Sequence, residues 1–209
     1  MSRPKLTYFD APVSRGEECR LALHVAGIDF EDERLKSADW PARKPSTPFG
    51  SLPVFTVPGH APVAQTNAIL VLIGRRHGLH PKDDFVAAQH EAVMAHVEDL
   101  RGAMRPSMVA KDPAEKKRLR EQLASEYLPT WAAQVERLIG EGPFFGGAAL
   151  CVVDLKLYVT QRWIRSGALD HIPVDIWAGF PKLVRVHDAV AAHPRIQAWY
   201  AAGAKSAST

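Results

Sequence analysis

The sequence predicts a two-part fold, in which an α/β domain at residues 1–80 precedes an all-helical domain at residues 85–209. Three observations lead to this prediction. Strand and helix signals alternate up to about residue 80, strand signals stop near Asp84, and the later residues carry apolar side chains at helical spacing. The short segment Pro81–Asp84 is expected to link the two domains.

The chain begins with a β-α-β pattern. The run Leu6–Phe9 predicts a strand, and Arg15–Ala26 predicts a helix because its apolar residues recur at helical spacing up to Gly27. Glu31–Leu35 is a weaker strand candidate. Three prolines interrupt residues 38–51, so we expect an irregular loop there.

A β-β-α pattern follows. Val54–Val57 and Pro62–Gln65 are short apolar runs separated by a turn, and together they predict a hairpin. In that turn, Pro58 and Gly59 suit the two central positions of a type II turn. Asn67–His77 then predicts a helix, because it has apolar residues on one face and is followed by a glycine.

The second part contains only helical patterns. Its apolar residues recur three or four positions apart, which is typical of helices with one buried face. The clearest examples are Val93, Val97, Leu100 and Met104, and later Leu183, Val186 and Val190.

The composition is that of an ordinary globular protein, with 209 residues, 46% hydrophobic and 23% charged. A formal charge of +3, from 26 basic and 23 acidic residues spread along the chain, does not favour nucleic acid as a partner. The densest basic run, residues 116–120, alternates with glutamates, so we interpret it as a solvated helix face.

Cysteine usage and hydropathy indicate a cytoplasmic setting. Cys19 and Cys151 have no paired spacing, and the chain does not begin with an apolar signal region. No apolar run approaches the ~20 residues needed to cross a bilayer. The histidines are not accompanied by a cluster of carboxylates or cysteines, so we expect no metal site.

Several motifs, in order along nearly the whole chain, resemble the cytosolic glutathione transferases. The pattern is most similar to the sigma class and its relatives, the mu and pi classes. The motifs are Lys5–Phe9, Arg15–Glu17, Ala38–Pro41 with Lys44, Phe49–Val54, Gln65–Ile69, Val97–Arg101, Phe180–Leu183 and Ala192–Ile196. The resemblance implies a thioredoxin-like first domain, a helical second domain, a homodimer and glutathione as co-substrate.

The resemblance makes Tyr8 the candidate catalytic residue. A phenol at the end of the first strand can donate a hydrogen bond to the thiolate of glutathione, which favours the charged form. A bond to a charged partner is worth ~1.5–3 kcal/mol, so a thiol pKa near ~8.5 would fall to roughly 6.5–7.5. The alternative is a tyrosine that only packs.

Some relatives use a serine at the start of the first helix instead. In this chain the matching position is Gly16, and Ser14 is interpreted as a turn or helix-cap residue. The chain carries one extra residue between Phe9 and Arg15 relative to the sigma pattern. Arg15 is included among the glutathione-binding residues, with its placement left open.

The resemblance also assigns the glutathione backbone and its γ-glutamyl end. Leu52 and Pro53 resemble the leucine and cis-proline pair that binds the cysteinyl backbone, and Ser51 is shorter than the usual polar residue before them. Gln65 and Thr66 would hold the γ-glutamyl carboxylate at a helix N-terminus. Alternatively, Thr66 is simply a helix N-cap.

The two ends of the tripeptide would be completed by side chains from elsewhere. Trp40 and Lys44 would bind the glycine carboxylate, with surface loop positions as the alternative. Asp99 resembles the acid that reaches across the dimer to the γ-glutamyl ammonium, or else it pairs with Arg101 or another helix charge.

Apolar and thioether side chains would contact the electrophile. Core packing explains each of them equally well. The residues are Phe9, Val13, Met104, Met108 and Trp163.

Two further motifs resemble structural devices of the family. Gly147, Cys151 and Asp154 resemble a helix-capping box in which a thiol replaces the usual hydroxyl, so this cap should be weaker than usual. Phe49 stands where some relatives insert an aromatic side chain into the partner subunit, with packing in its own loop as the alternative.

The expected activity is conjugation of glutathione to apolar electrophiles, by thiol activation and proximity. Two alternatives stay open: glutathione-dependent isomerisation or peroxide reduction at the same site, and a non-enzymatic ligand carrier. Neither nucleic acid nor a membrane is an expected partner.

Overall fold

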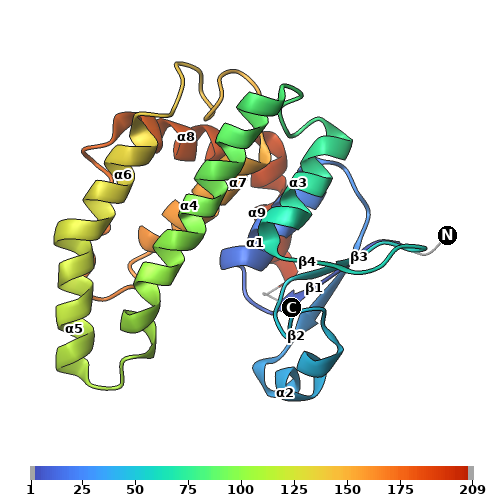
Figure 1. Cartoon of the computed structure of the whole chain (residues 1–209), viewed down its shortest axis with the longest axis horizontal. Coiled ribbons are helices and arrows are strands. Elements are labelled where there is room, and N and C mark those ends of the chain that lie inside the picture. Colours follow the sequence, from blue (N-terminus) through green and yellow to red (C-terminus); the bar gives the residue numbers. More distant parts are fainter. Residues whose placement is uncertain (1–2, 207–209) are drawn as a thin grey trace. The chain divides into compact units, whose positions relative to one another are not determined.

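The computed structural model describes residues 3–206, which form two compact units (Figure 1). The first unit combines the described residues of segments 1–83 and 192–209, and the second is Asp84–Ala191. Each unit is described by itself below.

The first unit is built on a four-stranded mixed sheet with the strand order β2-β1-β3-β4. β1 pairs in parallel with β2 and antiparallel with β3, and β3 pairs antiparallel with β4. This is the β-α-β and β-β-α order that the sequence predicted. The elements are β1 (Lys5–Phe9), α1 (Ser14–Val25), β2 (Glu31–Leu35), β3 (Val54–Thr56), β4 (Val63–Ala64) and α3 (Thr66–His77).

The local turn predictions are confirmed. The N–H of His60 donates to the carbonyl of Val57 over 3.0 Å, and Gly59 has φ 81°, as a type II turn requires. Helix α3 ends at Gly78, whose φ of 72° is the left-handed conformation typical of a glycine after a helix.

The loop between β2 and β3 is more regular than predicted. It contains the one-turn helix α2 (Trp40–Arg43), flanked by 3-10 turns at Ser37–Asp39 and Lys44–Ser46. The prolines do not prevent this, because Pro41 and Pro45 occupy the first positions of their turns, where a helix has no use for the missing N–H.

The C-terminal helix α9 (Pro194–Ser206) belongs to the first unit and contacts α1. The indole N–H of Trp199 donates to Glu17 over 2.8 Å, and Arg195 donates to the carbonyl of His24 over 3.1 Å. The compact units therefore differ from the predicted domains 1–80 and 85–209 at the C-terminal end. Helical periodicity marks α9 as a helix with a buried face but does not reveal which unit covers that face.

The second unit is all-helical, as predicted. The apolar positions selected from periodicity on α4 and α8 are buried. A π-helical turn at Leu123–Tyr127 connects α5 to α6. Among the described residues, no helix combines the length and the apolar character that crossing a bilayer requires. The helices are α4 (Asp84–Val109), α5 (Pro113–Gln122), α6 (Leu128–Glu136), α7 (Val152–Ile164) and α8 (Pro181–Ala192).

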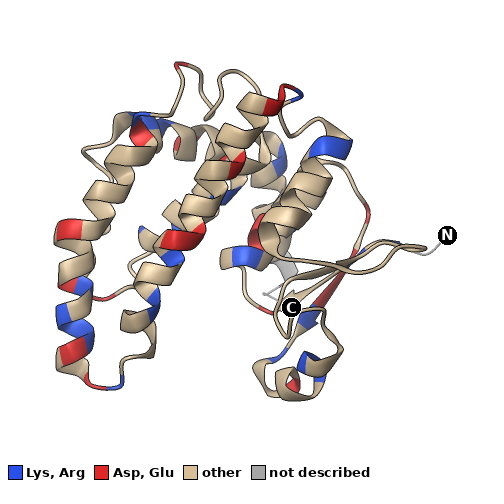
Figure 2. Ribbon diagram, in the orientation of Figure 1, with Lys and Arg blue, Asp and Glu red and all other residues tan. Residues whose placement is uncertain are grey.

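The interpretation of residues 116–120 as a solvated face is wrong for Arg120. Its side chain is buried, donates to the carbonyl of Asp170 over 3.2 Å and forms an ion pair with the carboxylate of the same residue. Basic and acidic residues do alternate along α5 (Figure 2), and Lys117 and Arg118 form exposed pairs with Glu121 and Glu115. Local charge alternation cannot reveal that the helix turns one of these cations inward.

The capping box at the start of α7 is present. The carboxylate of Asp154 accepts the N–H of Cys151 over 2.8 Å and the N–H of Phe145 over 2.6 Å. Gly147, with φ 133°, lies in the turn that pairs with Phe144. Burial, with a contribution from Asp154, raises the pKa of the Cys151 thiol to about 11, so this thiol stays protonated and is only a weak acceptor.

A Cys151→Ser exchange is expected to stabilise the protein, because a hydroxyl is a better N-cap acceptor than a thiol. The gain should be about 0.5–2 kcal/mol. Cys19 is fully buried in α1 and has no capping role, so Cys19→Ser is expected to destabilise the protein by about 1–3 kcal/mol. Thermal unfolding of both variants tests the pair. Equal and negative shifts would contradict the assigned cap.

Candidate functional site

The ring of Tyr8 lies directly against helix α1 at Gly16. A Cβ added at Gly16 would lie 2.8 Å from the Cβ of Tyr8 and closer still to its Cγ and Cδ1, which no side chain tolerates. Glycine is therefore required here for close approach of the helix to the strand. A serine at this position, where some relatives carry one, would collide with the ring of Tyr8.

Aromatic rings continue from Tyr8 toward α2. The ring centres of Tyr8 and Phe9 are 5.6 Å apart, and those of Phe9 and Trp40 are 5.7 Å apart, both in edge-to-face arrangements. The loop that carries Trp40 is thereby packed next to the end of β1. Lys44 follows on the next turn, and it lies against Gly50, whose φ is 57°.

The start of α1 differs in detail from the prediction. Val13 occupies the N-cap position, and Ser14 is the first helical residue, with a left-handed φ of 61°. Ser14 is thus a turn residue and not the cap. Arg15 lies in the first turn of α1, where it is half-buried.

The Leu52–Pro53 peptide bond is cis, as expected from the resemblance. Pro53 is buried at the residue before β3, and Ser51 and Leu52 are half-buried ahead of it.

Gln65 and Thr66 form an unusual entry to α3. Gln65 has φ 71° and ψ 118°, a combination that a residue with a side chain adopts only when its surroundings enforce it. Gln65 occupies the N-cap position, so the interpretation of Thr66 as the N-cap is wrong. The Thr66 hydroxyl is buried and has no hydrogen-bond partner among the described residues. A buried hydroxyl at a helix N-terminus without a partner suits an anionic ligand group.

Strand register brings these segments to one end of the sheet. Thr7 on β1 is opposite Val54 on β3, and Val54 is opposite Ala64 on β4. Each of these strand residues has a predicted site residue as its neighbour in the chain. Tyr8 follows Thr7, Pro53 precedes Val54, and Gln65 follows Ala64. Because paired strands run antiparallel here, these three segments lie side by side.

Asp99 lies on α4 in the second unit, and its side chain is 72% exposed. Its ion-pair partner is His96, at 3.5 Å, whereas Arg101 pairs with Glu98 at 2.7 Å. The alternative pairing of Asp99 with Arg101 is therefore wrong, whereas a partner elsewhere on the same helix is found in His96. Burial, together with the negative charge of Asp99, raises the pKa of Tyr127, which places that phenol near the carboxylate.

The residues predicted to contact an electrophile differ in exposure. Met104 is 1% exposed, so it is a core residue and the alternative of core packing holds for it. Met108 is 48% exposed, and its sulfur accepts a weak hydrogen bond from Arg120. Phe9, Val13 and Trp163 are half-buried and stay predictions.

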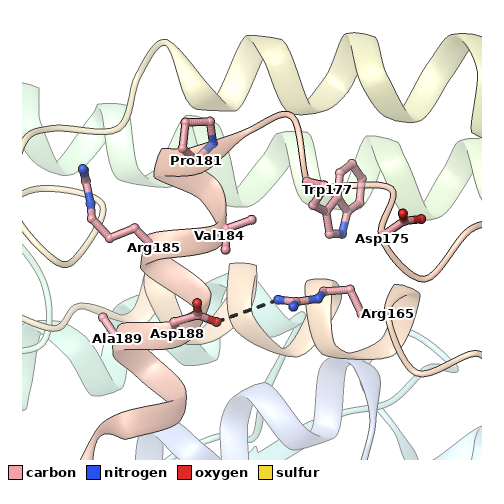
Figure 3. Close-up of a pocket in the computed structure, with 9 residues that line it drawn as sticks. Arg165, Asp175, Trp177, Pro181, Val184, Arg185, Asp188 and Ala189 are labelled. Atoms are coloured by element: carbon pink, nitrogen blue, oxygen red, sulfur yellow. Dashed lines mark ion pairs between the residues drawn. The ribbon is translucent and has the colours of Figure 1, made fainter.

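A separate groove of about 740 Å³ lies in the second unit, between the end of α7 and α8 (Figure 3). Arg165 extends toward Asp188, at 3.9 Å, and apolar residues such as Pro181 and Val184 also line the groove. None of the predicted site residues lines this groove. Within the described chain, no group of three or more His, Cys, Asp or Glu residues is placed to hold a metal ion.

Sequence reasoning missed the buried charged residues of α1. Glu17, Glu18 and Arg20 are fully buried on this helix. Arg20 pairs with Asp32 on β2 and Glu17 accepts a hydrogen bond from Trp199 on α9, and a local pattern cannot identify such distant partners.

Comparisons with known proteins agree with this geometry. Residues 4–75 match the family model "Glutathione S-transferase, N-terminal domain", and residues 98–203 match "Glutathione S-transferase, C-terminal domain". Glutathione S-transferase 1 of Ascaris suum is 45% identical over 106 residues, which is 51% of this chain and 50% of that protein.

Two solved structures have the same fold along nearly the whole chain. Prostaglandin synthase D of Nilaparvata lugens superimposes with a TM-score of 0.84 at 27% identity, covering 95% of this chain and 96% of that one. Na-GST-3 of Necator americanus, which is described as monomeric, gives a TM-score of 0.82 at 25% identity, covering 96% of this chain and 97% of that one.

A Gly16→Ala exchange is expected to destabilise the protein, because the new methyl group collides with the ring of Tyr8. Overpacking of this kind costs about 1–3 kcal/mol. Thermal unfolding of the variant is the measurement, and a fully stable Gly16→Ala protein would show that the contact is unimportant.

Proposed function

The chain belongs to the glutathione S-transferase family, and from this premise we propose that Tyr8 activates the thiol of glutathione for attack on apolar electrophiles. The protein is an enzyme that conjugates glutathione. The observation that carries the assignment of its site is the strand register that gathers Tyr8, the cis Leu52–Pro53 bond and the Gln65–Thr66 turn at one end of the sheet.

Thiol activation follows from the chemistry of a phenol beside a sulfur. The hydroxyl of Tyr8 donates a hydrogen bond that stabilises the thiolate more than the neutral thiol. One pKa unit corresponds to ~1.36 kcal/mol, so a bond worth ~1.5–3 kcal/mol lowers the thiol pKa by about one to two units. At neutral pH this raises the nucleophilic fraction by about an order of magnitude.

The unpartnered hydroxyl of Thr66 supports binding of the γ-glutamyl carboxylate. A carboxylate there would accept hydrogen bonds from this hydroxyl and from the N–H groups at the start of α3. The partial positive charge of the helix N-terminus would also attract it. The positive φ of Gln65 turns the backbone at this point. Leu52 would pair with the cysteinyl backbone, next to the shorter Ser51.

The glycine carboxylate would be bound from the loop after β2. Lys44 is exposed and Trp40 is half-buried, so an ammonium and an indole N–H are both available to a carboxylate. Arg15 stays a candidate for a further contact at the start of α1. For the electrophile, the remaining candidates are Phe9 and Val13 in the first unit and Met108 and Trp163 in the second.

One alternative to conjugation as the reaction of this protein has specific support. The structure from Nilaparvata lugens is named as a prostaglandin synthase, so a glutathione-dependent isomerase is the second candidate. Peroxide reduction and ligand carriage are less supported. We also propose a sigma-like class, which rests on the motifs, and a cytoplasmic location, which rests on cysteine usage.

The proposal of a homodimer rests on one face of α4. Exposed residues recur along this helix at alternating spacings of three and four, and they are small except for Phe85, which is 85% exposed. Such a stripe suits close packing against a helix or sheet of a second copy. It also contains Asp99, the proposed partner of the γ-glutamyl ammonium, and Phe49 is a further exposed aromatic side chain. The stripe consists of Phe85, Ala88, Ala92, Ala95, Asp99 and Gly102.

Tyr8→Phe is expected to reduce kcat about tenfold or more while leaving the affinity for glutathione nearly unchanged, because only the hydrogen bond to the thiolate is lost. The measurement is steady-state conjugation of a chromogenic aryl halide, together with calorimetric binding of glutathione. Normal turnover accompanied by lost affinity would assign Tyr8 to binding and remove its catalytic role.

Asp99→Ala is expected to weaken glutathione binding about tenfold, since an ion-paired hydrogen bond is lost. Glu121→Ala is the control, because Glu121 is also an exposed helix carboxylate and has no proposed ligand contact. Binding and oligomeric state are measured together by calorimetry and analytical ultracentrifugation. Full affinity in the Asp99 variant, or in a stable monomer, would refute the shared site.

A further inference from the structure

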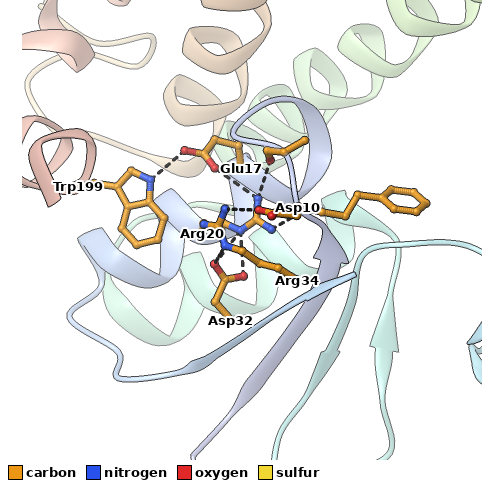
Figure 4. Close-up of polar contacts among 8 residues, drawn as sticks. Asp10, Glu17, Arg20, Asp32, Arg34 and Trp199 are labelled. Carbon is orange, nitrogen blue, oxygen red and sulfur yellow. Dashed lines mark hydrogen bonds and ion pairs between the residues drawn. The ribbon is translucent and has the colours of Figure 1, made fainter. Parts of the chain in front are cut away.

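A cluster of charged side chains connects α1 to β2 next to the end of β1 (Figure 4). Its centre is Arg20, which is fully buried on α1 one turn after Gly16. The guanidinium carbon lies 5.8 Å from the centre of the Tyr8 ring. Because residues four apart share one face of a helix, Gly16 and Arg20 together form the surface on which this ring rests.

Arg20 also holds the backbone that follows Tyr8. Its Nη2 donates to the carbonyl of Phe9 over 3.0 Å, and its Nη1 donates to the carbonyl of Ala11 over 2.8 Å. The guanidinium is planar and rigid, so two such bonds fix the end of β1 relative to α1. The orientation of the catalytic ring therefore depends on the position of this one side chain.

Acidic groups from two elements, β2 and α1, contact Arg20. Its Nε donates to both carboxylate oxygens of Asp32 on β2, at 2.9 and 3.1 Å. Asp32 also accepts a hydrogen bond from Arg34. Arg34 in turn donates to Asp10, the residue that follows β1. On the side of α1, Glu17 lies 3.5 Å from the Nη1 of Arg20.

Helix α9 reaches this cluster through Glu17. The carboxylate of Glu17 is fully buried and accepts the indole N–H of Trp199 over 2.8 Å. A buried carboxylate needs all its hydrogen bonds, because an unsatisfied charge in the interior is costly. Loss of the indole donor would therefore draw Glu17 closer to Arg20 and pull the guanidinium away from the two backbone carbonyls.

We propose that Arg20 is a positioning residue for Tyr8, and that the Trp199–Glu17 hydrogen bond couples helix α9 to the hydroxyl that activates glutathione. A cation facing the ring withdraws electron density from the phenol, which makes its hydroxyl a stronger donor to a thiolate. The inference rests on the proposed role of Tyr8 and extends it from the site to the C-terminal helix.

The test is an ultraviolet titration of bound glutathione in Trp199→Phe, which removes the indole donor and keeps an aromatic ring against His24. The pH at which the bound thiol ionises should rise by about half a unit or more relative to the parent enzyme. Glutathione affinity should stay within about twofold. Arg195→Gln is the matched control, because it removes another α9 contact with α1, the bond to the His24 carbonyl, without touching Glu17. It should leave the ionisation unchanged.

Arg20→Lys provides a second variant, which keeps the positive charge but loses the planar guanidinium that donates to two backbone carbonyls and to Asp32. It should shift the ionisation upward by at least as much as Trp199→Phe. An unshifted ionisation in folded Trp199→Phe, or an equal shift in Arg195→Gln, would overturn the coupling. These outcomes differ from failure of the proposed function, in which the parent enzyme itself would not lower the ionisation pH of the thiol.

Discussion

The contact between the ring of Tyr8 and the backbone of α1 at Gly16 is the constraint on which the site depends. It requires a residue without a side chain on the helix, and it brings the phenol to the end of β1 where two other segments already meet. The antiparallel pairing of β1, β3 and β4 supplies those segments, because the residues flanking Thr7, Val54 and Ala64 lie at the same end of the sheet. A tripeptide laid across that end would meet a hydroxyl donor, a cis peptide and a helix N-terminus.

The charged residues below the ring give this arrangement its rigidity. Most buried charges weaken a fold unless they are fully bonded, and Arg20 meets this condition with two backbone carbonyls and the carboxylate of Asp32. These bonds connect α1 to β2 and to the end of β1, and a separate hydrogen bond between Glu17 and Trp199 connects α1 to α9. A residue far along the chain, Trp199, thus belongs to the structural support of the tyrosine that we propose as catalytic.

Sequence patterns predicted those structural features that are determined by residues close together in the chain. Strand and helix periods, the Pro58–Gly59 turn and the glycine at the end of α3 depend on neighbours along the chain, and each was found. Long-range packing was beyond such patterns. The burial of Arg120 depends on Asp170, and the place of α9 depends on Glu17. The resemblance to a family proposes the glutathione residues. Of the two explanations for Met104, core packing agrees with its burial, because a core methionine and a pocket methionine have the same spacing on a helix.

The most direct measurement of the central claim is the ionisation pH of the thiol in the complex of the parent enzyme with glutathione alone, followed by the ultraviolet absorbance of the thiolate. A phenol that stabilises the anion should bring this pH at least about one unit below that of glutathione in solution. If both thiols ionise at the same pH, Tyr8 does not activate the nucleophile and the account of the site is wrong.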